Sequence, residues 1–394
     1  MQKNIAFAFW GCLFSLGAFA QSTSIDSILG QVEQNNKELK ALAENVKSKR
    51  LALKSGNNLP DPQLEAYYLP FGQHDAGDYT EFHINQSFEF PTVYSARRSL
   101  IEQQTAQLEL EYNTKKQEIL AEARDYCLNL IYLNKRLSIE SLRTEQAKQV
   151  FDQVKELYEK EQIGILEFNR AKVAWMQEQF KIQQIESDKK NLLLLLTNLN
   201  GGNEVNFSFD EYVSSLDLAT KDSLWRDKQV KDPELVQLKQ RETIAQRSLR
   251  LAKNKSLPNL TAGFNAQGVS GERFSGIYAG FSVPLWSNLN KVKAARAQVN
   301  FQQSFTASIM MQAYASFEKE YENYQIMLAR FQQYQSTLSD LNSDELLLQA
   351  YQLGEMSFLE YYMELQFYRQ AHDAMLNMQY QLYLSQTALL KHQL

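Results

Sequence analysis

The chain has 394 residues, of which only 15 are glycine and 7 proline, and its formal net charge is -5. A mildly acidic chain lacks the basic surface of a nucleic-acid-binding protein, and few turn-forming residues are typical of long helices rather than of a compact enzyme. The four histidines are scattered without metal-ligand spacing: His74, His83, His372 and His392. We therefore predict no catalytic residue, no cofactor, no bound metal and no nucleic-acid partner.

The N-terminus has the pattern of a secretory signal peptide at 1–20. Lys3 supplies the positive charge, an apolar stretch follows, and Ala-Phe-Ala at 18–20 forms a small-x-small cleavage site. The alternative, a lipidated Cys12, is disfavoured because Phe-Trp-Gly is a poor lipoprotein lead-in. Cleavage leaves Cys127 as the one cysteine, which excludes an intrachain disulfide.

The mature chain, 21–394, has no apolar run long enough for a transmembrane helix. An exported chain of this kind is periplasmic, secreted, or a β-barrel protein of an outer membrane. The remaining elements must therefore distinguish among these three locations.

Four segments alternate apolar and polar residues, two within 62–90 and two within 259–285. Each has about ten residues and one apolar face, as transmembrane strands have. In the segment that ends at Phe90, for example, Phe82 and Ile84 share one face while Glu81 and His83 share the other. We expect barrel–helix junctions at the four flanking prolines: Pro60, Pro91, Pro258 and Pro284.

From 92 to about 160 the chain contains neither glycine nor proline. Two lines of residues recur at every seventh position: Ala123, Leu130 and Leu137 in the first half, and Phe317, Tyr324, Phe331 and Leu338 in the second. Sustained seven-residue spacing predicts coiled-coil packing. About 65 residues at 1.5 Å each form a rod of roughly 100 Å, and we expect one such rod in each half.

The chain repeats itself at a spacing of about 195 residues, which indicates two copies of a half-protein, about 22–200 and 230–394. Pro284 follows Pro91 by 193 residues, whereas matches before the strands are 198 apart. Length changes belong in surface loops, so the first copy has a longer loop at about 71–78. Each copy reads helix, proline, hairpin, proline, long helix, turn, helix.

Four strands cannot close a membrane barrel, because single-chain barrels begin at eight and open edges are not tolerated in lipid. Three copies give twelve strands, which leaves room for a lumen. We therefore predict a homotrimer of mainly α chains with a β-barrel contribution. The alternatives are a periplasmic coiled-coil adaptor or other structural protein with soluble hairpins, and an exported enzyme, which the absence of a catalytic motif disfavours.

The whole mature chain resembles the TolC-like outer-membrane factors, the outer membrane efflux protein family. The resemblance rests on the duplication, the proline-bounded hairpins and the sequence from Tyr351 through Gly354 to Glu360. The first copy has Glu161 where the family's glycine is expected. Segments 59–62 and 86–91 look most like the CzcC-like heavy-metal efflux branch, although Thr92 stands where that branch commonly has glycine.

The resemblance implies a twelve-stranded barrel in the outer membrane above a periplasmic α-barrel of antiparallel coiled-coil helices. It implies an equatorial segment at about 196–232, in which 203–211 suits a short strand. It also implies a passive exit duct that joins a periplasmic adaptor (membrane fusion protein) and, through it, an inner-membrane transporter. The cargo would be heavy-metal cations, with drug efflux or type I secretion as alternatives.

The helix tips are the expected periplasmic gate, with these residues: Tyr158, Gly164, Glu167, Tyr351, Gly354 and Glu360. Glu167 and Glu360 occupy matching positions, so a trimer would place six carboxylates around the closed end, and a ring of acids favours cations. The alternative role is helix capping. Ser357 and Glu360 form a capping-box pattern, and an acid in the first turn is stabilised by the helix dipole.

Overall fold

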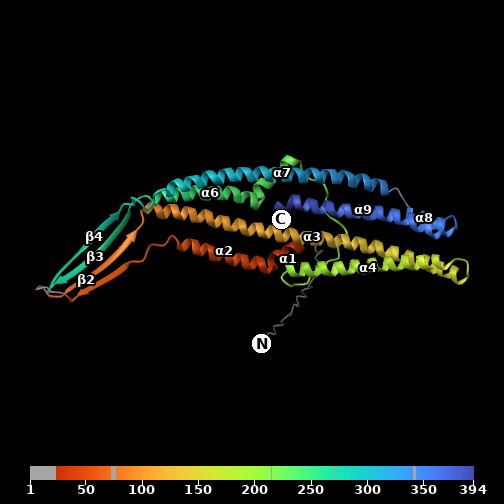
Figure 1. The fold of residues 1–394 in the computed structure, drawn as a ribbon, viewed down its shortest axis with the longest axis horizontal. Coiled ribbons are helices and arrows are strands. Elements are labelled where there is room, and N and C mark those ends of the chain that lie inside the picture. The colour runs from red at the N-terminus through yellow and green to blue at the C-terminus, as the bar shows by residue number, and fades with distance from the viewer. Residues whose placement is uncertain (1–23, 72–76, 214, 270, 340–342) are drawn as a thin grey trace, which may run out of the picture.

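The computed structural model describes residues 24–71, 77–213, 215–269, 271–339 and 343–394. A sheet lies at one end, long helices run from it to the far end, and the C-terminus lies near the middle of the helical part (Figure 1). The predicted signal peptide and the centre of the 71–78 loop fall outside the described residues. Within the described ranges, no helix is long and apolar enough to cross a membrane.

The first copy contains α1 (Ile25–Asn35), α2 (Lys37–Ser55), β1 (Gln63–Leu69), β2 (Tyr79–Phe88), α3 (Pro91–Glu159) and α4 (Ile165–Leu199). Ser24 Oγ caps α1 by accepting a hydrogen bond from the Ser27 amide at 3.1 Å. Pro91 lies in the first turn of α3, where its fixed φ suits a helix and its missing N–H is not needed. The 69 residues of α3 make a rod of about 100 Å, as predicted.

Helix α5 (Lys221–Lys231) lies between the two copies. The second copy contains α6 (Pro233–Asn254), β3 (Asn259–Val269), β4 (Glu272–Ser282), α7 (Lys291–Ser339), α8 (Ser343–Gln352), α9 (Phe358–Leu390) and the 3₁₀ turn η1 (Lys391–Gln393). Our prediction of a second rod of roughly 100 Å stays a prediction, because residues 340–342, between α7 and α8, lie outside the described ranges. With 49 residues, α7 is about 75 Å long.

The four strands form one antiparallel sheet in the order β1-β2-β3-β4. The hairpins of the two copies join where β2 pairs with β3, and Phe82 lies opposite Ala266 in that register. The alternation predicted from the sequence is therefore the alternation of the two sheet faces. Strands β1 and β4 are the edges of the sheet, and no described residue pairs with either outer edge.

The helices enclose three apolar clusters. One lies among α1, α3 and α4 around Ile28 and Leu196, and another lies among α5, α7 and α9 around Phe317 and Tyr324. The third lies at the far tips. Cys127 belongs to the first cluster, and burial raises the pKa of its thiol to about 12, as expected of a cysteine that packs rather than reacts.

Segment 203–211 forms no strand, so that expectation from the sequence was wrong. Its alternating Val205, Phe207 and Phe209 pack against the first apolar cluster, but the segment has no ladder partner among the described residues. Side chains take the place of the ladder: Asn134 Nδ2 donates to the Phe209 carbonyl at 2.6 Å. The alternation of apolar residues in this segment therefore marks one buried face of a segment that belongs to no sheet among the described residues.

The C-terminus is fixed against α5 by a buried histidine. His392 Nε2 lies 3.1 Å from Asp227 Oδ2, and Gln393 Nε2 donates to the same oxygen at 3.1 Å. The His392 side chain is fully buried. Burial lowers the pKa of His392, Asp227 opposes that shift, and nearby Lys228 reinforces it. The folded chain therefore favours the neutral imidazole.

Acidification should lower the stability of the folded chain through His392. The unfolded chain binds a proton at His392 near the ordinary pKa of about 6.5, before the folded chain does. The stabilisation is full above that pH and is lost as the pH falls below it. We expect thermal unfolding to shift downward between pH 7.5 and 5.5 by more in the unaltered protein than in His392→Gln. An equal shift in both proteins would contradict this role.

Candidate functional site at the helix tips

The turns at the two helix tips have the same backbone path. Between α3 and α4, the Glu161 amide donates to the Tyr158 carbonyl and the Gln162 amide donates to the Leu157 carbonyl, both at 2.9 Å. Between α8 and α9, the Gly354 and Glu355 amides make the equivalent bonds at 3.1 and 3.0 Å. Glu161 has φ 59° and Gly354 has φ 74°. The duplication thus places a glutamate in a left-handed position where its counterpart is glycine.

This difference predicts opposite effects of two substitutions. Glu161→Gly should stabilise the first tip by about 1 kcal/mol, because it relieves a left-handed residue that carries a Cβ. Gly354→Ala should destabilise the second tip by about the same amount; its added Cβ meets nothing within 4 Å, so strain is the one cost. Protease cleavage rates at the tips would measure both effects. If both substitutions changed the cleavage rate in the same direction, the left-handed backbone assigned to Glu161 and Gly354 would be contradicted.

The start of α9 forms the expected capping box. Glu360 Oε2 accepts from the Ser357 amide at 2.8 Å, and Ser357 Oγ accepts from the Glu360 amide at 3.3 Å. The Ser357 hydrogen bonds hold the pKa of Glu360 below its usual value. In the first copy Gly164 is the N-cap of α4 and offers no side chain, so Glu167 has no such partner there. The two matching glutamates therefore have different surroundings.

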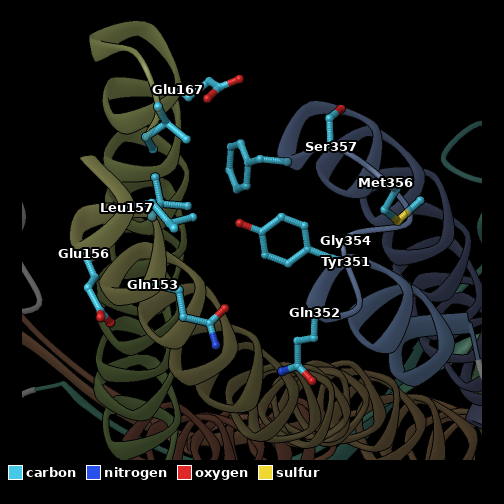
Figure 2. Close-up of a pocket in the computed structure, with 12 residues that line it drawn as sticks. Gln153, Glu156, Leu157, Glu167, Tyr351, Gln352, Gly354, Met356 and Ser357 are labelled. Atoms are coloured by element: carbon cyan, nitrogen blue, oxygen red, sulfur yellow. The ribbon is translucent and has the colours of Figure 1, made fainter. Parts of the chain in front are cut away.

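A hollow of about 770 Å³ separates the two tips. Figure 2 shows the Tyr351 ring extending from the α8 side toward the α3–α4 hairpin, with Glu167 above it and Gln153 below. Gly354 also lines the hollow. Burial, with a smaller contribution from Glu167, raises the pKa of Tyr351. The tips thus offer a cleft with one central tyrosine.

The predicted gate residues divide into two groups. Glu167, Tyr351 and Gly354 line the hollow, whereas Tyr158, Gly164 and Glu360 do not. Tyr158 stacks on Phe168 within its own hairpin, with the ring centroids 4.8 Å apart. Packing therefore accounts for Tyr158, and capping accounts for Glu360.

The four prolines lie where sheet and helices meet. The Pro60 carbonyl accepts from Gln86 Nε2 at 2.7 Å, which joins the entry of β1 to the end of β2. Pro258 immediately precedes β3, and Pro284 follows the end of β4. Unlike Pro91, Pro284 does not begin a helix, because α7 starts at Lys291.

A buried charge cluster that we did not predict from the sequence joins α3, α4 and α9. Arg143 Nη1 donates to Glu140 Oε1 and to Asp373 Oδ1, both at 2.8 Å. Arg369 Nη1 lies 3.4 Å from Glu178 Oε1. All of these side chains except Asp373 are almost fully buried. The available signal was Glu140, which stands seven residues after Leu133 on an apolar heptad line.

The described residues contain no group of three or more His, Cys, Asp or Glu arranged to hold a metal ion.

No protein-family model and no curated protein sequence matches the chain. Solved structures do. CusC, studied for transmembrane channel formation, matches with a TM-score of 0.77 at 14% identity, over 93% of this chain and 91% of that one.

Two further solved structures also match this chain over most of its length. The outer membrane protein VceC of Vibrio cholerae matches with a TM-score of 0.74 at 13% identity, over 93% of this chain and 95% of that one. The chain has the TolC-like fold. The open MtrE outer membrane channel of Neisseria gonorrhoeae gives 0.68 at 13% identity, over 93% and 88% of the two chains. The predicted fold class, mainly helical with four strands per chain, is confirmed.

Proposed function

We propose that the chain is one subunit of a homotrimeric outer-membrane channel, the passive exit duct of a tripartite efflux system. The observation that carries this proposal is the TolC-like fold with a four-stranded sheet open at both edges. Unpaired backbone groups at a sheet edge are too costly in lipid. Pairing β4 of one subunit with β1 of the next satisfies them and closes a barrel of twelve strands.

The two faces of the sheet suit lipid on one side and water on the other. Phe82, Ile277 and Phe281 lie on one face, and Ile277 is 91% exposed in the single chain. The opposite face carries a hydrogen-bonded polar group, in which Glu81 accepts from the Tyr79 hydroxyl at 2.9 Å and from Asn265 Nδ2 at 3.0 Å. An apolar exterior and a polar interior are typical of outer-membrane barrels.

Cysteine cross-linking tests the trimer. In a Cys127→Ser background, cysteines replacing Ala66 on β1 and Ala279 on β4 would be joined by a short bifunctional maleimide. We expect a detergent-dependent species near three times the 45.6 kDa chain mass. The matched control replaces Phe82 and Ala266, which pair within one chain, and should give no linked trimer. A soluble monomer that does not cross-link would reject the channel.

The hollow at the tips is the proposed docking place for the hairpin of a periplasmic adaptor, which in turn contacts an inner-membrane transporter. The CzcC-like resemblance supports heavy-metal cations as the cargo, and drug efflux or type I secretion are the competing assignments. A deletion strain challenged with a panel of metals and antibiotics tests the cargo. Sensitivity to antibiotics alone would overturn the metal assignment.

The different surroundings of the two glutamates predict different roles in the gate. Glu167→Gln should lower cation preference in single-channel recordings, because Glu167 is exposed at the hollow and three copies would surround the tunnel end. Glu360→Gln keeps a capping side chain and serves as the matched control, with a smaller change expected. Unchanged cation preference in the double variant would sink the gate hypothesis.

A further inference from the structure

The chain leaves the sheet differently in its two copies. In the first, two residues separate the end of β2 from α3, which begins at Pro91, and Val93 and Ala96 are buried. In the second, residues 283–290 separate β4 from α7, and residues 285–290 form what we call the junction turn. The duplication therefore makes the junction turn a local departure from an otherwise shared plan.

Hydrogen bonds hold the junction turn in a defined conformation. The Leu289 amide donates to the Trp286 carbonyl at 3.1 Å, and the Lys291 amide donates to the Asn288 carbonyl at 3.2 Å. Asn290 takes a left-handed φ of 62°, which asparagine tolerates better than most residues. Asn288 Nδ2 also donates to the Lys255 carbonyl at 2.7 Å, which fixes the turn to the end of α6.

Three large apolar side chains of the turn are exposed: Leu285 at 66%, Trp286 at 80% and Leu289 at 74%. They continue the exposed apolar row that includes Phe281 near the end of β4 and Val283 just after the strand. Scattered apolar residues are common on surfaces, but a contiguous patch marks an interaction site. Because the row on β4 is the face assigned to lipid, the turn lies where the sheet leaves the hydrocarbon.

Cations stand directly beyond this apolar patch. Lys291, Lys293 and Arg296, at the start of α7, are exposed, and none has an acidic partner within 4 Å among the described residues. The N-terminus of α7 adds positive partial charge. Tryptophan prefers the headgroup level, with its ring among the acyl chains and its N–H toward water. Adjacent cations are attracted to anionic phospholipid.

We infer that the junction turn anchors each subunit in the periplasmic leaflet of the outer membrane. Leu285, Trp286 and Leu289 enter the acyl-chain boundary, while the three cations of α7 bind the phosphates of anionic phospholipids. The inference rests on the proposed membrane channel and adds a lipid partner to it. A neighbouring subunit is the competing occupant of this surface.

Tryptophan quenching tests the insertion. A chain beginning at Gln21 with Trp175→Phe and Trp225→Phe keeps Trp286 as its single tryptophan. In vesicles of phosphatidylcholine brominated near the glycerol end of the acyl chains, we expect at least half of the emission to be quenched. Aqueous iodide should quench less than a tenth. The matched control keeps Trp175, at the far tips, in place of Trp286 and should be insensitive to the brominated lipid.

A second comparison tests the headgroup. Brominated phosphatidylglycerol should quench Trp286 at least twofold more strongly than brominated phosphatidylcholine at equal content. The triple variant Lys291→Gln, Lys293→Gln and Arg296→Gln should abolish this difference. The matched control is Lys148→Gln, Lys155→Gln and Lys160→Gln on the distant part of α3 and its tip, which changes the same charge and should keep the difference.

Vesicle flotation separates the two hypotheses. Failure to float with the vesicles would overturn the proposed channel. Flotation together with strong iodide quenching would show an exposed turn and would overturn the anchor. Flotation with no quenching by either agent would show that a neighbouring subunit covers Trp286, and equal quenching by both headgroups would overturn the role of the cations.

Discussion

Replacing Arg143 with methionine should destabilise the helical part of the molecule by about 3–5 kcal/mol, the usual cost of removing one partner from a buried ion pair. The Arg143 side chain is 5% exposed, and Glu140, one of its two carboxylate partners, is 1% exposed. Burial already raises the pKa of Glu140, and Arg143 is the largest opposing influence. Without Arg143, the Glu140 carboxylate must take up a proton or remain buried with Lys181, 3.9 Å away, as its nearest cation.

Thermal unfolding followed by helical circular dichroism would measure the loss. Lys148→Met on the same helix is the matched control; its pair with Asp152 is about half exposed and should contribute less than 1 kcal/mol. The double variant Glu140→Gln, Arg143→Met should recover part of the stability, because it removes the stranded charge. An Arg143→Met protein as stable as Lys148→Met would contradict the buried cluster.

The consequences of this cluster extend along the helices to the tips. Arg143 belongs to α3, and its partner Asp373 belongs to α9, so the cluster ties the first hairpin to the second. Arg369 and Glu178 add a second tie between α9 and α4. Movement of one hairpin relative to the other must break these charge-assisted interactions, of which the pair between Arg369 and Glu178 is almost fully buried.

The sequence predicted the features that a single local rule determines. Strands appear as a period of two because one sheet face is apolar and the other polar. Helix α3 appears as 69 residues without an interior glycine or proline. The duplication even identified Glu161 as the counterpart of Gly354, and both adopt a left-handed backbone.

Features that depend on distant partners could not be predicted in this way. Glu178 and Arg369 are 191 residues apart, and a charged residue on a helix is ordinarily interpreted as a surface residue. Segment 203–211 alternates like a strand, yet alternation cannot show whether a second strand lies beside it. Pro91 and Pro284 occupy equivalent positions, but the asparagines after Pro284 favour a turn where the first copy begins a helix.

Gly263→Ala should disrupt the sheet, because a Cβ at this position would lie 2.7 Å from the Ile84 carbonyl oxygen and 2.5 Å from Cζ of Tyr278. The Tyr278 ring lies across Gly263 from the neighbouring strand β4. The ring can move aside. The Ile84 carbonyl cannot, because it belongs to the backbone of β2, which pairs with β3 on the side away from β4. Forcing an extra carbon into such a site costs about 1–3 kcal/mol. Since the proposed trimeric barrel would close through every strand, we expect a large loss of heat-resistant trimer on gels.

Gly276→Ala is the matched control, because it lies on the same face of the sheet and its added Cβ meets nothing within 4 Å. Its trimer yield should match that of the unaltered protein. Adding Tyr278→Ala to Gly263→Ala should restore the yield only in part, since the Ile84 oxygen still blocks the new carbon. Full restoration would assign the whole effect to the ring, and a Gly263→Ala protein that assembles as well as Gly276→Ala would contradict the close approach of β2 and β3 at this glycine.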